Sequence, residues 1–186
     1  MKRTTLILLL LALGLGGFVY FYEIRGATQR QEAKEQQRQL FSFEEDRVQS
    51  FTIQRQNQTL KFERSRQPGA SKWQMNPSNT PASDAAVAYL LDLLASGTSD
   101  RTVTVGANQL GEYGLDRPQA TVEVKLNNGE THRLILGKPD FNRNFLYAQA
   151  DPWAQPTGQV QVLLVSTNFE NAVNRPLSEW KQATGK

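Results

Sequence analysis

The sequence predicts an α+β fold, in which one sheet of mostly antiparallel strands is combined with two main helices. Runs of alternating apolar and polar residues recur in pairs, as half-buried strands of hairpins do. Two stretches, at 81–96 and after Thr167, have helical signals instead. Residues 41–186 are numerous enough to form a single domain with a substantial core.

The first stretch, residues 6–22 from Leu6 to Tyr22, contains no charged residue. A helix needs roughly 20 apolar residues to cross a bilayer, so this run is at the short end of that range. A cleaved secretory signal is the alternative, but the run ends in bulky aromatic residues, which are typical of the membrane interface. We therefore expect residues 1–25 to form a retained transmembrane anchor that contacts the lipid bilayer through residues 6–22.

Lys2 and Arg3 precede the apolar run, and the positive-inside rule then places the N-terminus in the cytoplasm. The rest of the chain is expected in the periplasm or the thylakoid lumen. The formal net charge is +3, but setting Lys2 and Arg3 aside leaves 19 basic against 18 acidic residues. This balance argues against nucleic-acid binding, which needs a basic surface. The chain has no cysteine, so disulfides, thiolate nucleophiles and cysteine metal sites are excluded.

Residues 26–40 are rich in Gln, Glu, Lys, Arg and Ala, which favour helices. No apolar stripe runs along them, so a solvated helical stalk is favoured over a coiled coil. The extracytoplasmic α+β domain is expected to span residues 41–186.

The first half of this domain begins with a hairpin at 48–55 and 59–64, with Phe51, Ile53, Leu60 and Phe62 facing inward. A third strand at 72–75 directs Trp73 and Met75 inward. The helix at 81–96 follows, with Val87, Leu90, Leu91 and Leu94 on one face and Ser83 or Thr80 as its N-cap. A strand at 101–105 and a helical turn at 109–113 complete this half.

The second half repeats the order of hairpin, third strand and helix. Its hairpin lies at 121–126 and 131–136, with an Asn-Gly turn at 127–130, and the strand 145–149 comes next. A strand at 160–165 leads to Thr167 and Glu170, which have the spacing of a capping box. Pro176 interrupts the following helix, and residues 177–180 form a last turn. An internal pseudo-repeat is a hypothesis that this order raises.

Several short motifs resemble the DUF4340 family of bacterial proteins, most closely its short cyanobacterial members. They are the anchor followed by Phe41-Ser42-Phe43, residues 73–77, residues 81–84, the run Tyr113-Gly114-Leu115-Asp116-Arg117-Pro118, Leu136-Gly137-Lys138 and Tyr147. The resemblance covers roughly residues 41–165, and the YGLD-x-P run is its most specific part. The family has no known catalytic residues, so the resemblance assigns none to this chain. Because some members are encoded beside transporter subunits, the resemblance implies an accessory role for a membrane complex.

The best candidate for a recognition surface combines two polar segments. Residues 140–144 form a polar loop with one aromatic residue between two strands, and loops of this kind often carry binding functions. Together with the YGLD-x-P run they give the candidate residues Tyr113, Asp116, Arg117, Asp140, Asn142 and Arg143. Ordinary turn chemistry also explains the same residues, and it is the favoured explanation. Trp153 and Trp180 are either exposed anchors for a partner or side chains that pack over sheet edges.

No catalytic, cofactor or metal site is predicted. His132 is the only histidine, and strand alternation places it on the same face as Leu134 and Leu136. No nucleophile motif accompanies it, so a structural or surface histidine is favoured. The carboxylates Glu44, Glu45 and Asp46 are consecutive and lack calcium-loop spacing, so a solvated turn is expected.

These observations favour a non-enzymatic interaction module, anchored in a membrane and accessory to a membrane-protein partner. A module that binds a small ligand, glycan or lipid is the alternative, and a hydrolase with unrecognised carboxylates is a third hypothesis. A partner-binding module should expose an apolar patch, a ligand module should contain a pocket with converging polar groups, and an enzyme should bring titratable groups together in a cleft.

Overall fold

The computed structural model describes residues 38–65 and 71–183. Gln39–Lys186 form one compact unit, which begins two residues before the domain boundary expected from the sequence. The expected anchor at 6–22 and most of the expected stalk lie outside the described residues. None of the helices in the described part is long and apolar enough to span a membrane.

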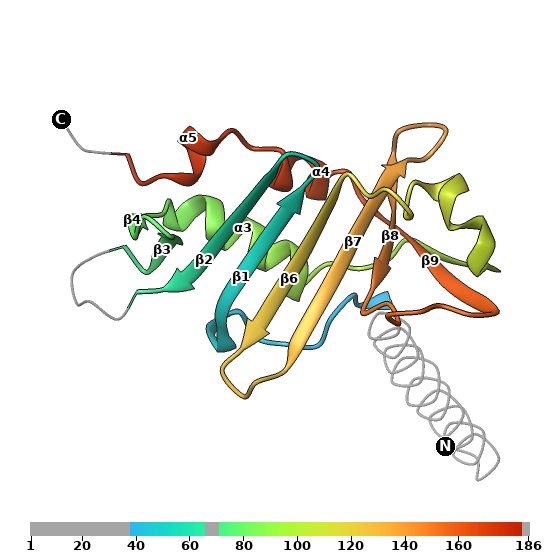
Figure 1. Cartoon of the computed structure of the whole chain (residues 1–186), viewed down its shortest axis with the longest axis horizontal. Coiled ribbons are helices and arrows are strands. Elements are labelled where there is room, and N and C mark those ends of the chain that lie inside the picture. Colours follow the sequence, from blue (N-terminus) through green and yellow to red (C-terminus); the bar gives the residue numbers. More distant parts are fainter. Residues whose placement is uncertain (1–37, 66–70, 184–186) are drawn as a thin grey trace, which may run out of the picture. The chain divides into compact units, whose positions relative to one another are not determined.

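Nine strands of the described chain form one sheet in the order β4-β3-β2-β1-β6-β7-β8-β9-β5 (Figure 1). Every neighbouring pair is antiparallel. The strands are β1 Val48–Arg55, β2 Gln58–Arg64, β3 Trp73–Asn76, β4 Thr80–Pro81, β5 Arg101–Gly106, β6 Ala120–Leu126, β7 Thr131–Pro139, β8 Phe145–Ala150 and β9 Gln159–Ser166. The α+β class with an antiparallel sheet is thus confirmed.

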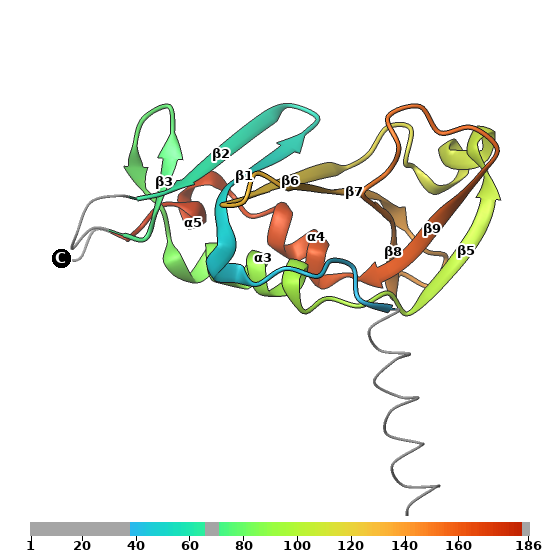
Figure 2. The ribbon, with the colours of Figure 1, turned by 90° about the horizontal axis from the view of Figure 1, so that it is seen from below.

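The α-helices lie together on one face of the sheet, as Figure 2 shows. They are α3 Asp84–Ala95, α4 Asn168–Val173 and α5 Leu177–Trp180. The Ser83 side chain accepts a hydrogen bond from the backbone N–H of Ala86, so it is the N-cap of α3. The periodicity of α3 sets its position, because its apolar stripe has to be buried against the sheet.

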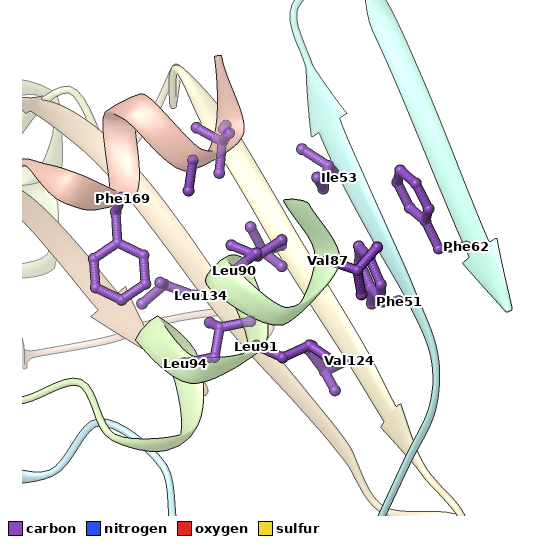
Figure 3. Close-up of a cluster of buried hydrophobic side chains, with 14 of the residues drawn as sticks. Phe51, Ile53, Phe62, Val87, Leu90, Leu91, Leu94, Val124, Leu134 and Phe169 are labelled. Carbon is purple, nitrogen blue, oxygen red and sulfur yellow. The ribbon is translucent and has the colours of Figure 1, made fainter. Parts of the chain in front are cut away.

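The main core fills the layer between α3, α4 and the sheet (Figure 3). Val87, Leu90 and Leu94 of α3 are fully buried, and Phe169 of α4 is buried beside them. Phe51 and Phe62, on neighbouring strands, stack with their ring centroids 4.5 Å apart. The side chains expected inward from β1, β2, β3 and α3 are all buried, so the sequence-based assignment of this face is confirmed.

A smaller apolar cluster lies on the opposite face of the sheet. There the 3₁₀-helix η3, Ala107–Tyr113, covers strands β7, β8, β9 and β5, and the cluster is centred on Val105, Leu115 and Val162. Alternation along β8 explains the two faces, because Leu146 and Ala148 join the main core whereas Tyr147 joins this cluster.

The sheet order is symmetrical about the central pair β1 and β6. The strands β3-β2-β1 and β6-β7-β8 extend from that pair in opposite directions. An internal repeat of hairpin, third strand and helix would produce this arrangement. β5 departs from it, because the strand crosses to the far edge and pairs with β9.

Two expectations about element ends are wrong. Thr167 precedes α4 in a helical backbone conformation, and its side chain makes no capping hydrogen bond, so the capping box does not form. The strand expected to end before Gly137 continues to Pro139, with an irregularity between Leu136 and Pro139 in its pairing with β8. Both motifs depend on backbone geometry that neighbouring elements impose.

Candidate functional site

The YGLD-x-P run closes η3 tightly onto β7. Gly114 has φ +69°, and a Cβ placed there would lie 2.9 Å from the backbone nitrogen of Lys138. A Cβ on Gly137 would overlap the carbonyl oxygen of Tyr113 and approach Leu115 to 3.1 Å. The two glycines therefore permit an approach between the two segments that any larger residue would obstruct. This contact explains why the two motifs occur together.

Tyr113 and Leu115 anchor this run to the smaller apolar cluster. The Tyr113 ring meets Tyr147 edge to face, with centroids 4.9 Å apart. Leu115 is 5% exposed, and its backbone nitrogen donates to the Leu110 carbonyl. Asp116 and Arg117, which follow, are exposed. Of the candidate recognition residues in this run, Tyr113 therefore has a clear packing role and the other two face solvent.

The loop of residues 140–144 joins β7 to β8 at the top of Figure 1. The Asp140 carboxylate accepts hydrogen bonds from the backbone nitrogens of Asn144 (2.8 Å) and Phe145 (3.0 Å). Arg143 has φ +58°, and its backbone nitrogen donates to the Asp140 carbonyl. These bonds hold the loop in one conformation, so Asp140 acts in forming the loop.

Phe141, at the tip of this loop, is 99% exposed. Asn142 and Arg143 are exposed beside it. The register Ala120↔Leu136 and Pro139↔Leu146 places the start of β6, the end of β7 and the start of β8 at the same end of the sheet. The structure thus brings the two predicted segments to one end, and the contact of Gly114 with Lys138 joins them. We call residues 113–117 and 140–144 the loop surface.

His132 lies on the helix-covered face, as its alternation predicts. Its ring packs against Phe41 and Phe43, with centroid distances of 5.3 and 5.4 Å. Its Nδ1 lies 2.8 Å from a carboxylate oxygen of Asp151, whose other oxygen accepts from the backbone nitrogen of Arg133 at 2.7 Å. This cluster fastens the segment before β1 to the end of β8, which is a structural use of the histidine.

The carboxylates at 44–46 lie at the 3₁₀-turn η2, Glu45–Arg47. Glu44 and Asp46 are exposed, whereas Glu45 is half-buried. Burial raises the pKa of Glu45, the Asp92 carboxylate raises that pKa further, and Arg64 opposes the rise. Across the described ranges, no group of three or more acidic or histidine side chains is placed to bind a metal ion.

Sequence reasoning missed a cleft between β8 and β9, at the opposite end of β8 from the loop surface. It encloses about 380 Å³ and is lined by side chains of the strands and of the loop between them. Trp153 in that loop is 84% exposed, whereas Trp180 is fully buried against Phe62, so the two tryptophans have different roles. The feature of the sequence that could have indicated this cleft is the charge-free run at 152–158, which contains two prolines and a tryptophan.

The fold and its closing motifs define an α+β domain whose antiparallel sheet carries helices on one face and a short 3₁₀-helix on the other. The chain belongs to the family described as Domain of unknown function (DUF4340), whose profile matches residues 73–184. The matched region contains both glycine motifs and Tyr147. Searches of curated proteins and of solved structures found no match.

Proposed function

We propose that this protein is a membrane-anchored, non-enzymatic accessory module that docks onto a membrane-protein partner. Residues 6–22 would hold it in the bilayer with the N-terminus in the cytoplasm. The domain would then lie in the periplasm or the thylakoid lumen, and its loop surface would contact the partner.

The observation that carries this proposal is the full exposure of Phe141 on a loop that is already ordered. An aromatic side chain in water contributes nothing to folding, whereas burying it in a partner's pocket gives about 1.5–3 kcal/mol. Because the loop is fixed by Asp140, little conformational entropy is lost on binding. The polar rim that surrounds such an anchor would be provided by four exposed residues, Asn142, Arg143, Asp116 and Arg117.

Support for a non-enzymatic role comes from how the candidate chemical groups are used. The imidazole of His132 packs against the rings of Phe41 and Phe43 and is hydrogen-bonded to Asp151. The Asp140 carboxylate accepts two backbone hydrogen bonds. These groups already have structural partners, which favours a structural role over acid–base catalysis.

The test is gentle detergent extraction of the tagged full chain, followed by mass spectrometry of the proteins that remain bound. Phe141→Ala should reduce partner recovery by at least tenfold, as the burial energy above implies. Leu177→Ala is the matched control, because Leu177 is also an exposed apolar residue, at 39%, but lies in α5. Equal recovery with folded Phe141→Ala and with the unchanged chain would remove the loop surface as the docking site.

The membrane anchor is tested separately by alkaline carbonate washing of membranes. The unchanged chain should remain in the pellet, and Leu13→Arg should release it because a charge at the centre of a span costs about 2.5–3.5 kcal/mol. Release of the unchanged chain would contradict the anchor and leave the docking proposal to be judged on its own.

A second candidate function, a ligand-binding module, is favoured by the cleft between β8 and β9. Its volume of about 380 Å³ is in the range of small-molecule sites.

A further inference from the structure

The cleft exists because β8 and β9 separate before either strand ends. Their pairing runs from Phe145↔Ser166 to Ala148↔Leu163 and stops there. Beyond that point, β8 continues to Ala150 beside β7, and the first half of β9 pairs only with β5. The loop 151–158, which lines the cleft, joins the lower end of β8 to the start of β9 in Figure 1.

Backbone polar groups face this opening without a strand partner. The Asp151 nitrogen donates to Arg133 of β7, and the Ala107 nitrogen donates to Gly158 on the other side. Since successive residues of an antiparallel strand point their N–H and C=O groups to alternate sides, Ala150 and Gln161 must point theirs into the cleft. A backbone group left unpaired in a cleft favours a ligand with hydrogen-bonding groups.

The side chain of Gln149 crosses the opening. It is 7% exposed, and its Nε2 donates to the Gln161 carbonyl at 3.2 Å. Within the described part of the chain, its Oε1 receives no hydrogen bond, so an acceptor fixed in position is available at the wall of the cleft.

The lining carries almost no charge. Among the described residues that line it, the single ionisable one is Asp151, and both carboxylate oxygens of Asp151 are already engaged by His132 and Arg133. None of these described lining residues is a cation, which disfavours a phosphate or carboxylate ligand. The remaining lining combines amide and hydroxyl side chains with an indole and two prolines: Gln149, Gln155, Gln159, Gln161, Thr157, Trp153, Pro152 and Pro156.

We propose that this cleft binds a neutral saccharide. Hydroxyl groups of the sugar would donate to Gln149 Oε1 and bond the backbone groups of Ala150 and the backbone N–H of Gln161, whose carbonyl already accepts from Gln149 Nε2. Its apolar ring face would lie on the exposed indole of Trp153. The site is at the opposite end of β8 from the loop surface, so the proposal goes beyond docking to a partner, and either can fail alone.

The test is a titration of the full chain with uncharged trisaccharides of glucose and of N-acetylglucosamine, in which tryptophan fluorescence is the readout. Trp73 and Trp180 are 4% and 0% exposed, so a change in emission reports on Trp153. The protein is held in lipid nanodiscs, because maltoside detergents carry a neutral disaccharide themselves. We expect saturable binding by at least one trisaccharide.

Two variants and one control assign that binding to the cleft, with calorimetry as the readout. Trp153→Ala, at an exposed position, and Gln149→Leu, at a buried one, should each weaken binding at least tenfold, whereas Leu177→Ala, at an exposed position in α5, should leave it unchanged. Circular dichroism establishes that each variant is folded. If Gln149→Leu does not fold, the result for Trp153→Ala decides whether the cleft is the binding site. The proposal is overturned if no neutral trisaccharide binds, if binding survives Trp153→Ala, or if glucose 6-phosphate binds more tightly than glucose.

Discussion

The closing contact between Tyr113 and Gly137 can be tested by adding one methyl group. In Gly137→Ala, the new Cβ would overlap the Tyr113 carbonyl oxygen and lie 3.1 Å from Leu115 Cδ2. The first of these atoms belongs to the backbone, so no side-chain rotation relieves the overlap. The variant has to move η3 and the following turn away from β7.

The cost of Gly137→Ala follows from two effects. Adding a methyl group to a closely packed contact costs typically about 1–3 kcal/mol. Displacement also exposes part of Leu115, which is 5% exposed and whose full burial gives about 1.5–3 kcal/mol. We therefore expect a loss of about 2–3 kcal/mol in the free energy of unfolding. For a domain of this size, that loss lowers Tm by roughly 4–12 °C.

Two other glycines separate overlap from backbone strain. Gly158 has φ +76° with no atom within 4 Å of its Cβ position, so Gly158→Ala introduces only the strain of a left-handed residue, about 1–2 kcal/mol. Gly114 combines φ +69° with the close approach to Lys138. Gly114→Ala should therefore be the most destabilising of the three.

The assay is urea unfolding of the three variants, followed by circular dichroism, with the slope of the transition compared between them. The expected order of destabilisation is Gly114→Ala, then Gly137→Ala, then Gly158→Ala. A loss below about 0.5 kcal/mol for Gly137→Ala, which is the usual range for neutral surface changes, would refute the idea that this close approach holds η3 on the sheet.

Two further predictions concern the segment before and around β1. Asp151→Ala removes the acceptor for His132 Nδ1 and for the Arg133 nitrogen, so thermal unfolding should show a loss of about 1–3 kcal/mol in the free energy of unfolding. Asp151→Asn should recover much of that loss. Equal stability of Asp151→Ala and the unchanged chain would contradict the role of this cluster. The pKa of Glu45 is raised in the folded state, so its ionisation weakens the fold as pH rises from 4.5 through that pKa. Glu45→Gln should therefore raise Tm at neutral pH and lose this advantage below pH 4.5, and a variant less stable than the unchanged chain at pH 7 would show that the sign is wrong.

Local patterns were sufficient to predict most elements. The alternation around Phe51 and Phe62 identified the first hairpin, and the spacing of Val87, Leu90 and Leu94 identified α3 and its buried face. Such patterns are reliable because the period of the apolar residues places them all on one face of the strand or helix, and that face has to be buried away from water. The capping box at Thr167 failed because three residues of sequence do not fix the backbone conformation that the motif requires.

The candidate site was only partly predictable. The residues of the loop surface were identified as turn-forming and polar, but their sequence did not separate Asp140, which orders the loop, from Phe141, which the loop exposes. The cleft was missed because it depends on where two strands stop pairing. Gln149 occurs in an ordinary strand pattern, and nothing in that pattern indicates that β9 separates from β8 there.

By itself, the sequence determined the α+β class, the inward faces of the strands and of α3, and the presence of two glycines that tolerate close approach. Only the tertiary structure decided the strand order, including the placement of β5 beside β9, and the pairing of Gly114 with β7 and of Gly137 with the Tyr113 turn. The physical reason is the range of the interactions. Burial patterns and backbone preferences act within a few residues, whereas strand order and close contacts depend on which distant surfaces fit together.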